Sequence, residues 1–236
     1  MYELLESITE SAKKTLQAQQ VNANNLANAS TVGFKAEIAY YMDQEGALSL
    51  QSMPDLTPGL TQQTGRPLDI SVQGEGWITV LTPDGTEAYT RRGDLQVDSL
   101  GQLKTGSGQA VVGNNGPIAL PPFSDIEIGT DGTLSIVPIG QTPNTLAVVD
   151  RIKLVSLEIG QLQRSEEGNL QLPDGEVAPP DANVRIVSGA IEGSNVNVVG
   201  ELVRMIDLAR RFESEIQLMQ DAKENSQALA SVMNLN

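Results

Sequence analysis

The stretch from Leu68 to Leu81, LDISVQGEGWITVL, decides the fold class. From Leu68 to Val72, apolar residues alternate with polar ones, a period of two that is typical of a strand with one buried face. A glycine-rich turn at Gly74–Gly76 follows, and the apolar run Trp77–Leu81 comes directly after it. The stretch therefore predicts two consecutive strands, with Trp77, the single tryptophan, as a core residue.

Short apolar runs continue on the C-terminal side of this stretch. Pro83-Asp84-Gly85 has the composition of a hairpin turn. Later apolar runs are separated by the turn dipeptides Leu100-Gly101 and Asp131-Gly132. Turns at intervals of roughly 8–16 residues favour an antiparallel sheet over helices that alternate with parallel strands. We therefore predict a central antiparallel β domain over residues 68–190.

The segment before this domain has a different composition. Between Met42 and Pro67 the chain is rich in Gln, Ser, Thr, Gly and Pro, and Pro54 and Pro58 interrupt regular elements. The sequence therefore predicts an irregular connector over residues 36–67.

A helix is predicted at the N-terminus, within a segment that we place at residues 1–35. No Pro or Gly occurs from Tyr2 to Ala29, and apolar residues recur there at helical intervals. Because this apolar stripe is narrow, an isolated helix would be marginal in water and needs a partner. The stripe consists of Leu5, Ile8, Ala12, Leu16, Ala23 and Leu26.

A second long helix is predicted in the C-terminal segment, residues 191–236, where no Pro or Gly lies between Glu201 and Asn236. Its apolar residues alternate steps of four and three, the repeat of a coiled-coil seam. The partner of this seam is the sheet, the N-terminal helix or a helix of a neighbouring subunit. The seam consists of Val198, Leu202, Met205, Ala209, Phe212, Ile216 and Met219.

An asparagine cluster marks the end of the first helix. Asn22, Asn25 and Asn28 recur every three residues, and Asn24 adds a fourth amide. Asn is a poor residue for a helix interior, so helix stability does not explain the cluster. Two interpretations remain: a fraying helix end capped by Gly33, or a surface whose amides bond to neighbouring chains.

Composition narrows the possible functions. Thirty acidic residues against 15 basic ones give a net charge of −15, which disfavours nucleic acid as a partner. No apolar run is long enough to span a membrane. The chain has no His and no Cys, so the commonest metal ligand, the usual proton-transfer group and thiolate ligands are absent. We predict no catalytic, cofactor-binding or metal-binding residues, no cofactor and no enzymatic activity.

Three groups of motifs resemble the flagellar rod and hook protein family. The first is Ala23–Asn28 with Thr31-Val32-Gly33-Phe34-Lys35. The second lies in the β region: Arg66–Asp69, Gly76-Trp77, Tyr89–Leu95 and Leu100–Leu103. The third is Ser194–Asn197 with Glu201–Ile206 and Arg210–Glu213. Within the family, Arg185–Val196 and Ala209–Glu213 look most like the proximal-rod branch, with the distal rod as the alternative.

This resemblance implies a structural subunit of the bacterial flagellar basal-body rod, the drive shaft for motility. The terminal helices would pair in a coiled-coil-like layer of the assembled rod, outside which the β domain lies. The partners would be proximal and distal rod proteins, further copies of the chain, and the flagellar export apparatus. Export would proceed without a cleaved signal peptide to the periplasmic rod. A secreted, adhesin-like β protein is the alternative from another class.

The resemblance also implies which residues take part in assembly. On the C-terminal side these are the seven seam residues given above. On the N-terminal side they are Asn24, Asn25, Leu26, Asn28, Thr31, Gly33 and Phe34.

Overall fold

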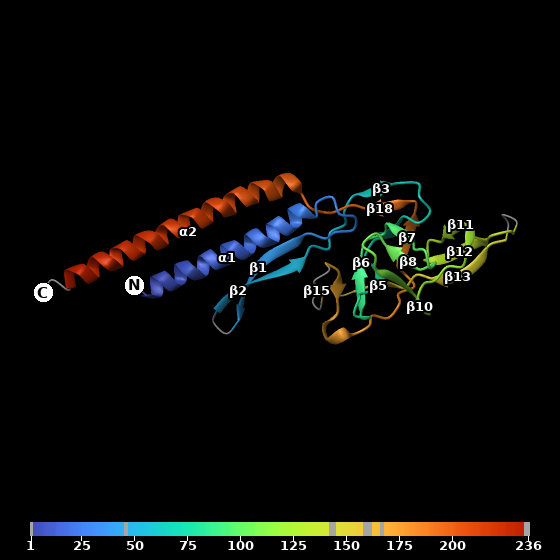
Figure 1. Ribbon diagram of the computed structural model, residues 1–236, viewed down its shortest axis with the longest axis horizontal. Coiled ribbons are helices and arrows are strands. Elements are labelled where there is room, and N and C mark those ends of the chain that lie inside the picture. The colour runs from blue at the N-terminus through green and yellow to red at the C-terminus, as the bar shows by residue number, and fades with distance from the viewer. Residues whose placement is uncertain (1, 45–46, 142–144, 158–161, 166–167, 234–236) are drawn as a thin grey trace. The chain divides into compact units, whose positions relative to one another are not determined.

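The computed structural model describes residues 2–44, 47–141, 145–157, 162–165 and 168–233 (Figure 1). The chain forms two compact units. Unit 1 consists of residues 1–29, 36–55 and 196–236, and unit 2 consists of residues 30–35 and 56–195. The predicted fold class is confirmed in outline, because an antiparallel β domain is flanked in sequence by an N-terminal and a C-terminal helix.

Unit 1 contains both helices, which lie side by side (Figure 1). Helix α1 spans Tyr2–Ala27 and helix α2 spans Val198–Met233. The predicted continuation of the second helix to Asn236 falls on residues outside those that the structure describes. Neither helix, over its described residues, is long and apolar enough to cross a membrane.

The prediction of an irregular connector was wrong for most of residues 36–67. Strands β1 (Glu37–Gln44) and β2 (Ala47–Pro54) form an antiparallel hairpin in unit 1, with Glu37 opposite Pro54. Pro54 ends β2 instead of interrupting it, a position that a sheet tolerates. Ile38 and Met42 of β1 are each 42% exposed, so neither belongs to a closed apolar core.

Unit 2 is built around antiparallel strands. Within the described residues, nine strands form its largest sheet, in the order β15-β16-β6-β5-β9-β8-β7, with β10 beside β9 and β14 beside β5. These strands are β5 (Trp77–Leu81), β6 (Glu87–Thr90), β7 (Leu95–Val97), β8 (Leu103–Thr105), β9 (Ala110–Gly113), β10 (Gly116–Pro117), β14 (Leu154–Val155), β15 (Gln163–Arg164) and β16 (Leu170–Gln171).

The remaining strands of unit 2 form smaller sheets. Strands β11 (Phe123–Ile128), β12 (Thr133–Pro138) and β13 (Ala147–Arg151) make one of them. Strand β4 (Ile70–Gln73) pairs with β17 (Arg185–Ser188), and β3 (Thr61–Gln63) pairs with β18 (Ala190–Glu192). A short 3-10 helix, η2, spans Pro173–Gly175. The two strands predicted from Leu68–Leu81 are confirmed as β4 and β5, although each pairs with other strands.

Two apolar clusters hold unit 2 together. The larger lies between the sheets and includes the fully buried Ile78, Leu95 and Leu134. The smaller surrounds Trp77 and Tyr89, which confirms Trp77 as a core residue. The Tyr89 hydroxyl accepts a hydrogen bond from the Ala178 N–H at 2.8 Å, and burial raises the pKa of Tyr89.

Leu134→Ala tests whether unit 2 depends on the larger cluster. Leu134 is 0% exposed, so the change leaves a cavity, and we expect the free energy of unfolding to fall by about 2–5 kcal/mol. Denaturant titration with Trp77 fluorescence measures this, because the single tryptophan lies in unit 2. Leu146→Ala is the matched control, since Leu146 is 54% exposed. Equal effects of the two changes would contradict the assignment of the core.

Candidate functional site

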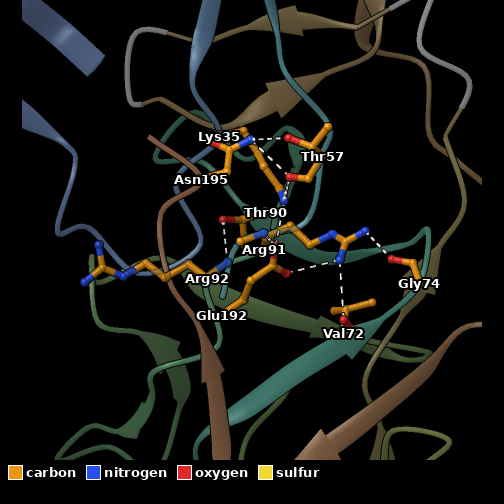
Figure 2. Close-up of polar contacts among 10 residues, drawn as sticks. Lys35, Thr57, Val72, Gly74, Thr90, Arg91, Arg92, Glu192 and Asn195 are labelled. Atoms are coloured by element: carbon orange, nitrogen blue, oxygen red, sulfur yellow. Dashed lines mark hydrogen bonds and ion pairs between the residues drawn. The ribbon is translucent and has the colours of Figure 1, made fainter. Parts of the chain in front are cut away.

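A buried carboxylate joins distant parts of unit 2. Glu192, the last residue of β18, is 2% exposed and forms ion pairs with two cations that are themselves buried (Figure 2). Its Oε1 lies 2.6 Å from Lys35 Nζ, and its Oε2 lies 3.1 Å from an Arg91 guanidinium nitrogen. We call Lys35, Arg91 and Glu192 the buried ion cluster.

Backbone groups complete the bonding of Lys35 and Glu192. Lys35 Nζ also donates to the Thr57 carbonyl at 2.8 Å, and the Gly59 N–H donates to Glu192 Oε1 at 2.8 Å. Asn195 Nδ2 donates to the same Thr57 carbonyl at 3.0 Å. Both carboxylate oxygens of Glu192 are therefore bonded within unit 2, an arrangement that suits structural cross-linking better than proton transfer.

Arg91 follows directly after β6 and connects the cluster to the sheets. Its guanidinium donates to the carbonyls of Val72, at 3.4 Å, and Gly74, at 2.6 Å. It also lies 5.0 Å from the centroid of the Trp77 ring, within cation–π range. Burial lowers the pKa of Arg91, and the Glu192 carboxylate opposes that shift. A guanidinium stays protonated in such a setting, so the cluster contains three charges.

Gly33 allows the segment Thr31–Phe34 to approach Arg91 closely. Its φ is +68°, and a Cβ at this position would lie 2.4 Å from the backbone of both Arg91 and Arg92. Its N–H donates to the Glu192 carbonyl at 2.7 Å. Only glycine fits this position, for conformational and steric reasons together. Helix α1 ends earlier, at Ala27, so Gly33 serves this contact and does not cap the helix.

The rest of the Thr31–Phe34 turn is also anchored in unit 2. The Thr31 carbonyl accepts a hydrogen bond from the Phe34 N–H at 3.3 Å, and Phe34 itself is buried. The Asn195 N–H donates to the Phe34 carbonyl at 3.4 Å. The segments before α2 and after α1 are thus bonded to each other inside unit 2.

The asparagines of α1 are divided between the inside and the outside of unit 1. Asn25 Nδ2 donates to the Glu37 carbonyl at 2.8 Å, and Asn25 Oδ1 accepts the Glu37 N–H at 2.8 Å, so this amide holds the start of β1. Asn22 donates to the backbone and the side chain of Glu201 on α2. Asn24 is exposed, and Leu26 is half-buried. Asn28 Nδ2 donates to the Asn24 carbonyl at 3.0 Å.

Helix α1 buries polar residues where the sequence predicted only apolar ones. Thr15 and Asn22 are buried, whereas Leu16 and Ala23 of the predicted stripe are exposed. Across from Thr15, the carboxylate of Glu215 accepts hydrogen bonds from Ser11 at 2.6 Å and Thr15 at 3.1 Å. These bonds stabilise the buried polar groups. Because each donor on α1 needs its own acceptor on α2, the bonds also fix the register of the two helices.

The most buried residues of α2 form a row along the helix, the best-buried row. This row shares every seventh residue with the predicted seam. Met205, Phe212 and Met219 are half-buried and belong to both rows, and Ile216 of the predicted seam is half-buried as well. Val198, Leu202 and Ala209 of the predicted seam are exposed. The best-buried row runs through Glu201, Met205, Leu208, Phe212, Glu215, Met219 and Ala222.

An exposed apolar strip remains at the start of α2. We give the name α2 strip to five large apolar residues that are 43–72% exposed in this chain. So many exposed apolar side chains within nine consecutive residues are typical of an interaction surface. The strip consists of Val198, Val199, Leu202, Val203 and Ile206.

Neither the buried ion cluster nor the polar contacts between the helices were predicted from the sequence. One signal in the sequence could have revealed the cluster: a single charged residue inside an otherwise apolar or glycine-rich motif. Lys35 follows Gly33-Phe34 in this way, and Glu192 lies between Ile191 and Gly193. Such isolated charges are expected to be paired when the motif is buried.

Family models match the chain in three places. A flagella basal body rod protein model matches residues 9–35, a flagellar hook protein FlgE/F/G D1 domain model matches 71–136, and a flagellar basal body rod FlgEFG protein C-terminal model matches 187–232. Lys35, Arg91 and Glu192 each fall in a different one of these matches. The buried ion cluster therefore connects the three parts of the chain that carry the likeness.

Individual relatives match along nearly the whole length. The chain is 44% identical to the flagellar basal-body rod protein FlgF of Salmonella typhimurium, over 91% of each chain. It is 42% identical to FlgF of Escherichia coli, over 91% of this chain and 92% of the relative. Identity to the rod protein FlgG of Bacillus subtilis is 31%, over 94% and 96%. The chain therefore belongs to the flagellar basal-body rod protein family and is FlgF-like within it.

Proposed function

We propose that this chain is a non-enzymatic structural subunit of the proximal rod of the flagellar basal body. It assembles there with other rod subunits and with further copies of itself. The names of the FlgF relatives support the place in the basal body. The identity to FlgF of Salmonella typhimurium and of Escherichia coli, 44% and 42%, exceeds the 31% identity to FlgG of Bacillus subtilis. Export through the flagellar export apparatus without signal cleavage belongs to the same proposal.

The α2 strip is the observation that carries this proposal. Helix α1 covers the best-buried row of α2 and leaves the strip uncovered within the described chain. Burying apolar surface contributes about 25 cal/mol per Å², so association through the strip is favourable. Val198 and Leu202 of the predicted seam therefore act in assembly as part of this strip. Phe212, Ile216 and Met219 support assembly by holding α2 against α1, in a coiled-coil-like layer.

The N-terminal assembly residues, which lie between Asn24 and Phe34, contribute to assembly in two ways under this proposal. Asn25 and Gly33 fix the backbone on either side of the passage from unit 1 to unit 2, through the bonds to Glu37 and Glu192. Asn24 is exposed on α1 and available to a neighbouring subunit. Leu26, Asn28, Thr31 and Phe34 keep the turn between these positions in one conformation.

The buried ion cluster has a mechanical role in the proposed drive shaft. The chain passes between the units after residues 29, 35, 55 and 195. On the unit 2 side of these passages, Gly33, Lys35, Thr57 and Asn195 are all bonded to the cluster or to one another. Torque that enters unit 2 along these segments is therefore shared among them and reaches the sheets through Arg91.

Ile206→Asp tests the α2 strip. Ile206 is 54% exposed, so we expect unchanged helix content and an unchanged Trp77 unfolding transition in the purified monomer. In an assembled interface the carboxylate would be desolvated, at a cost of several kcal/mol. The amount of this chain in isolated basal bodies should fall about tenfold or more, and motility should be lost.

Two further variants serve as controls for Ile206→Asp. Ile206→Val keeps the apolar surface and should assemble normally. Leu100→Asp makes the same kind of change at an exposed leucine of unit 2 and should also leave assembly intact. Normal incorporation of Ile206→Asp into basal bodies would rule out the strip as an assembly surface.

Glu192→Gln tests the buried ion cluster. The change keeps the shape of the side chain but leaves two buried cations without their carboxylate. We expect the free energy of unfolding of unit 2 to fall by about 3–5 kcal/mol, measured by Trp77 fluorescence in denaturant.

Glu127→Gln provides the matched control for this prediction. Glu127 lies in β11 of the same unit and is exposed, so the same chemical change should cost at most about 0.5 kcal/mol. If the two variants unfolded at the same denaturant concentration, the cluster would have no role in stability.

A further inference from the structure

Charges of alternating sign line one side of α2. Arg204, Asp207 and Arg211 are exposed at intervals of three and four residues, and they fall within about 60° of one another around the helix. They border a groove of about 290 Å³ between α1, β1 and α2. Glu201 also lines this groove, but its carboxylate accepts a hydrogen bond from Asn22. We call Arg204, Asp207 and Arg211 the charged row.

The charged row is open to a partner outside the chain. None of its three residues takes part in an ion pair among the described residues. A cationic partner would be repelled by Arg204 and Arg211, and an anionic partner by Asp207. A side-chain amide has both an N–H donor and a carbonyl acceptor, so it can bond to an arginine or to an aspartate. The charged row therefore suits a row of amides at a matching spacing.

The exposed side of α1 carries such a row. Gln17, Gln20 and Asn24 are exposed, also at intervals of three and four residues and within about 60° around the helix. We call these three residues the amide row. Two small apolar residues, Ala23 and Ala27, are exposed beside it. The amide row thus has an apolar border.

The charged row has an apolar border too, which is the α2 strip. Val203 of the strip lies about 40° around α2 from Asp207. Viewed from the N-terminus of each helix, the polar row follows the apolar residues in the same rotational sense. Two such faces bring apolar residues together, and polar residues together, only when the helices run antiparallel.

We propose that the exposed side of α1 in a second copy of this chain lies antiparallel along α2. The amide row of that copy then faces the charged row in reverse order. All three pairs fit one register to within one residue, about 1.5 Å along the axis. This inference rests on the proposed function, because it specifies how copies meet in the rod. The pairs are Asn24 with Arg204, Gln20 with Asp207, and Gln17 with Arg211.

The positions of the two alanines along α1 favour the same direction. In the antiparallel register Ala23 and Ala27 of the second copy come opposite residues 200–205 of α2, within the α2 strip. The two polar rows could also be aligned in parallel, because their spacings are equal. That alignment would place Ala23 opposite Arg210 and Ala27 opposite Ser214, outside the strip. The apolar surfaces meet only in the antiparallel arrangement.

The contact has a defined end and leads to continued growth. It ends before Asp221, because Glu6 of the second copy would face Asp221 in this register and like charges repel. A copy whose α1 covers its neighbour still presents its own α2 to the next copy. Contacts between two different surfaces extend into open assemblies, whereas a two-fold dimer needs the same surface on both partners.

Cysteine cross-linking tests the register, because the chain has no cysteine of its own. Gln17→Cys with Arg211→Cys places two thiols opposite each other across the proposed contact, where Cα atoms within about 7 Å permit a disulfide. The variant is examined in basal bodies from cells that lack the unmodified chain. After mild oxidation we expect dimers and larger multiples of this chain on non-reducing gels, whereas a disulfide within one chain would leave the mass unchanged.

Gln17→Cys with Arg204→Cys is the matched control. Position 204 is about 10 Å along α2 from position 211, so the two thiols are too far apart, and the cross-linked fraction should be about tenfold lower or less. Each single-cysteine variant should give no multiples. Gln20→Cys with Asp207→Cys, at the middle pair, should cross-link as Gln17→Cys with Arg211→Cys does.

Several outcomes would overturn the proposal. Equal or stronger cross-linking of the control would exclude the antiparallel register. Products whose mass is not a multiple of this chain would assign the α2 surface to a different rod subunit. If neither in-register pair gave multiples, copies would not meet through this contact.

The unmodified chain separates this inference from the proposed function. If the unmodified chain were absent from isolated basal bodies, the proposed function itself would be wrong. If it were present and the in-register pairs gave no multiples, only the contact between copies would be wrong. The substituted side chains are all exposed, so circular dichroism of each purified variant should show an unchanged fold.

Discussion

One buried carboxylate, that of Glu192, is the constraint on which the rest of unit 2 depends. A charge removed from water needs ion pairs and hydrogen bonds, and Glu192 obtains them from Lys35, Arg91 and the backbone of Gly59. Each of these partners lies more than 100 residues from Glu192 in the sequence. The electrostatic requirement of a single side chain therefore determines where the segments next to both helices attach to the sheets.

Unit 1 is held together by a different balance of forces. Its helices bury Thr15, Asn22 and Asn25, whose side chains form hydrogen bonds with Glu215, Glu201 and Glu37, while Asn22 Oδ1 has no donor among the described residues. Hydrogen bonds contribute only about 0.5–1.5 kcal/mol each, but they specify register more sharply than apolar contact does. Polar residues inside the pair leave apolar residues of α2 outside it. The helix pair thus gains a defined register while the α2 strip stays available to other subunits.

The sequence predicted the elements better than the contacts between them. Periodicity was sufficient for both helices and for the strands on either side of Gly74–Gly76, because burial of one face imposes a repeat. The prediction failed for the β1–β2 hairpin, because the polar, proline-containing composition of residues 42–67 outweighed the period-two repeat of Ile38, Tyr40 and Met42. It also placed Leu16 on the inner face of α1, where Thr15 lies, because an apolar count ignores polar residues that are satisfied by hydrogen bonds. Pairing partners such as Lys35 and Glu192 are set by tertiary structure alone.

The hydrogen bond between Ser11 and Glu215 spans 204 positions of the chain, and this has a consequence for biosynthesis. Most of unit 2 lies in the continuous segment 56–195, so it can fold while the polypeptide is still being made. Helix α1 is synthesised first and contacts β1 and β2, but its contacts with α2 form only after the C-terminal residues have left the ribosome. Contacts between such distant positions form late, because a long loop must close before they are made. Unit 1 is consequently completed last, after most of unit 2 has been synthesised.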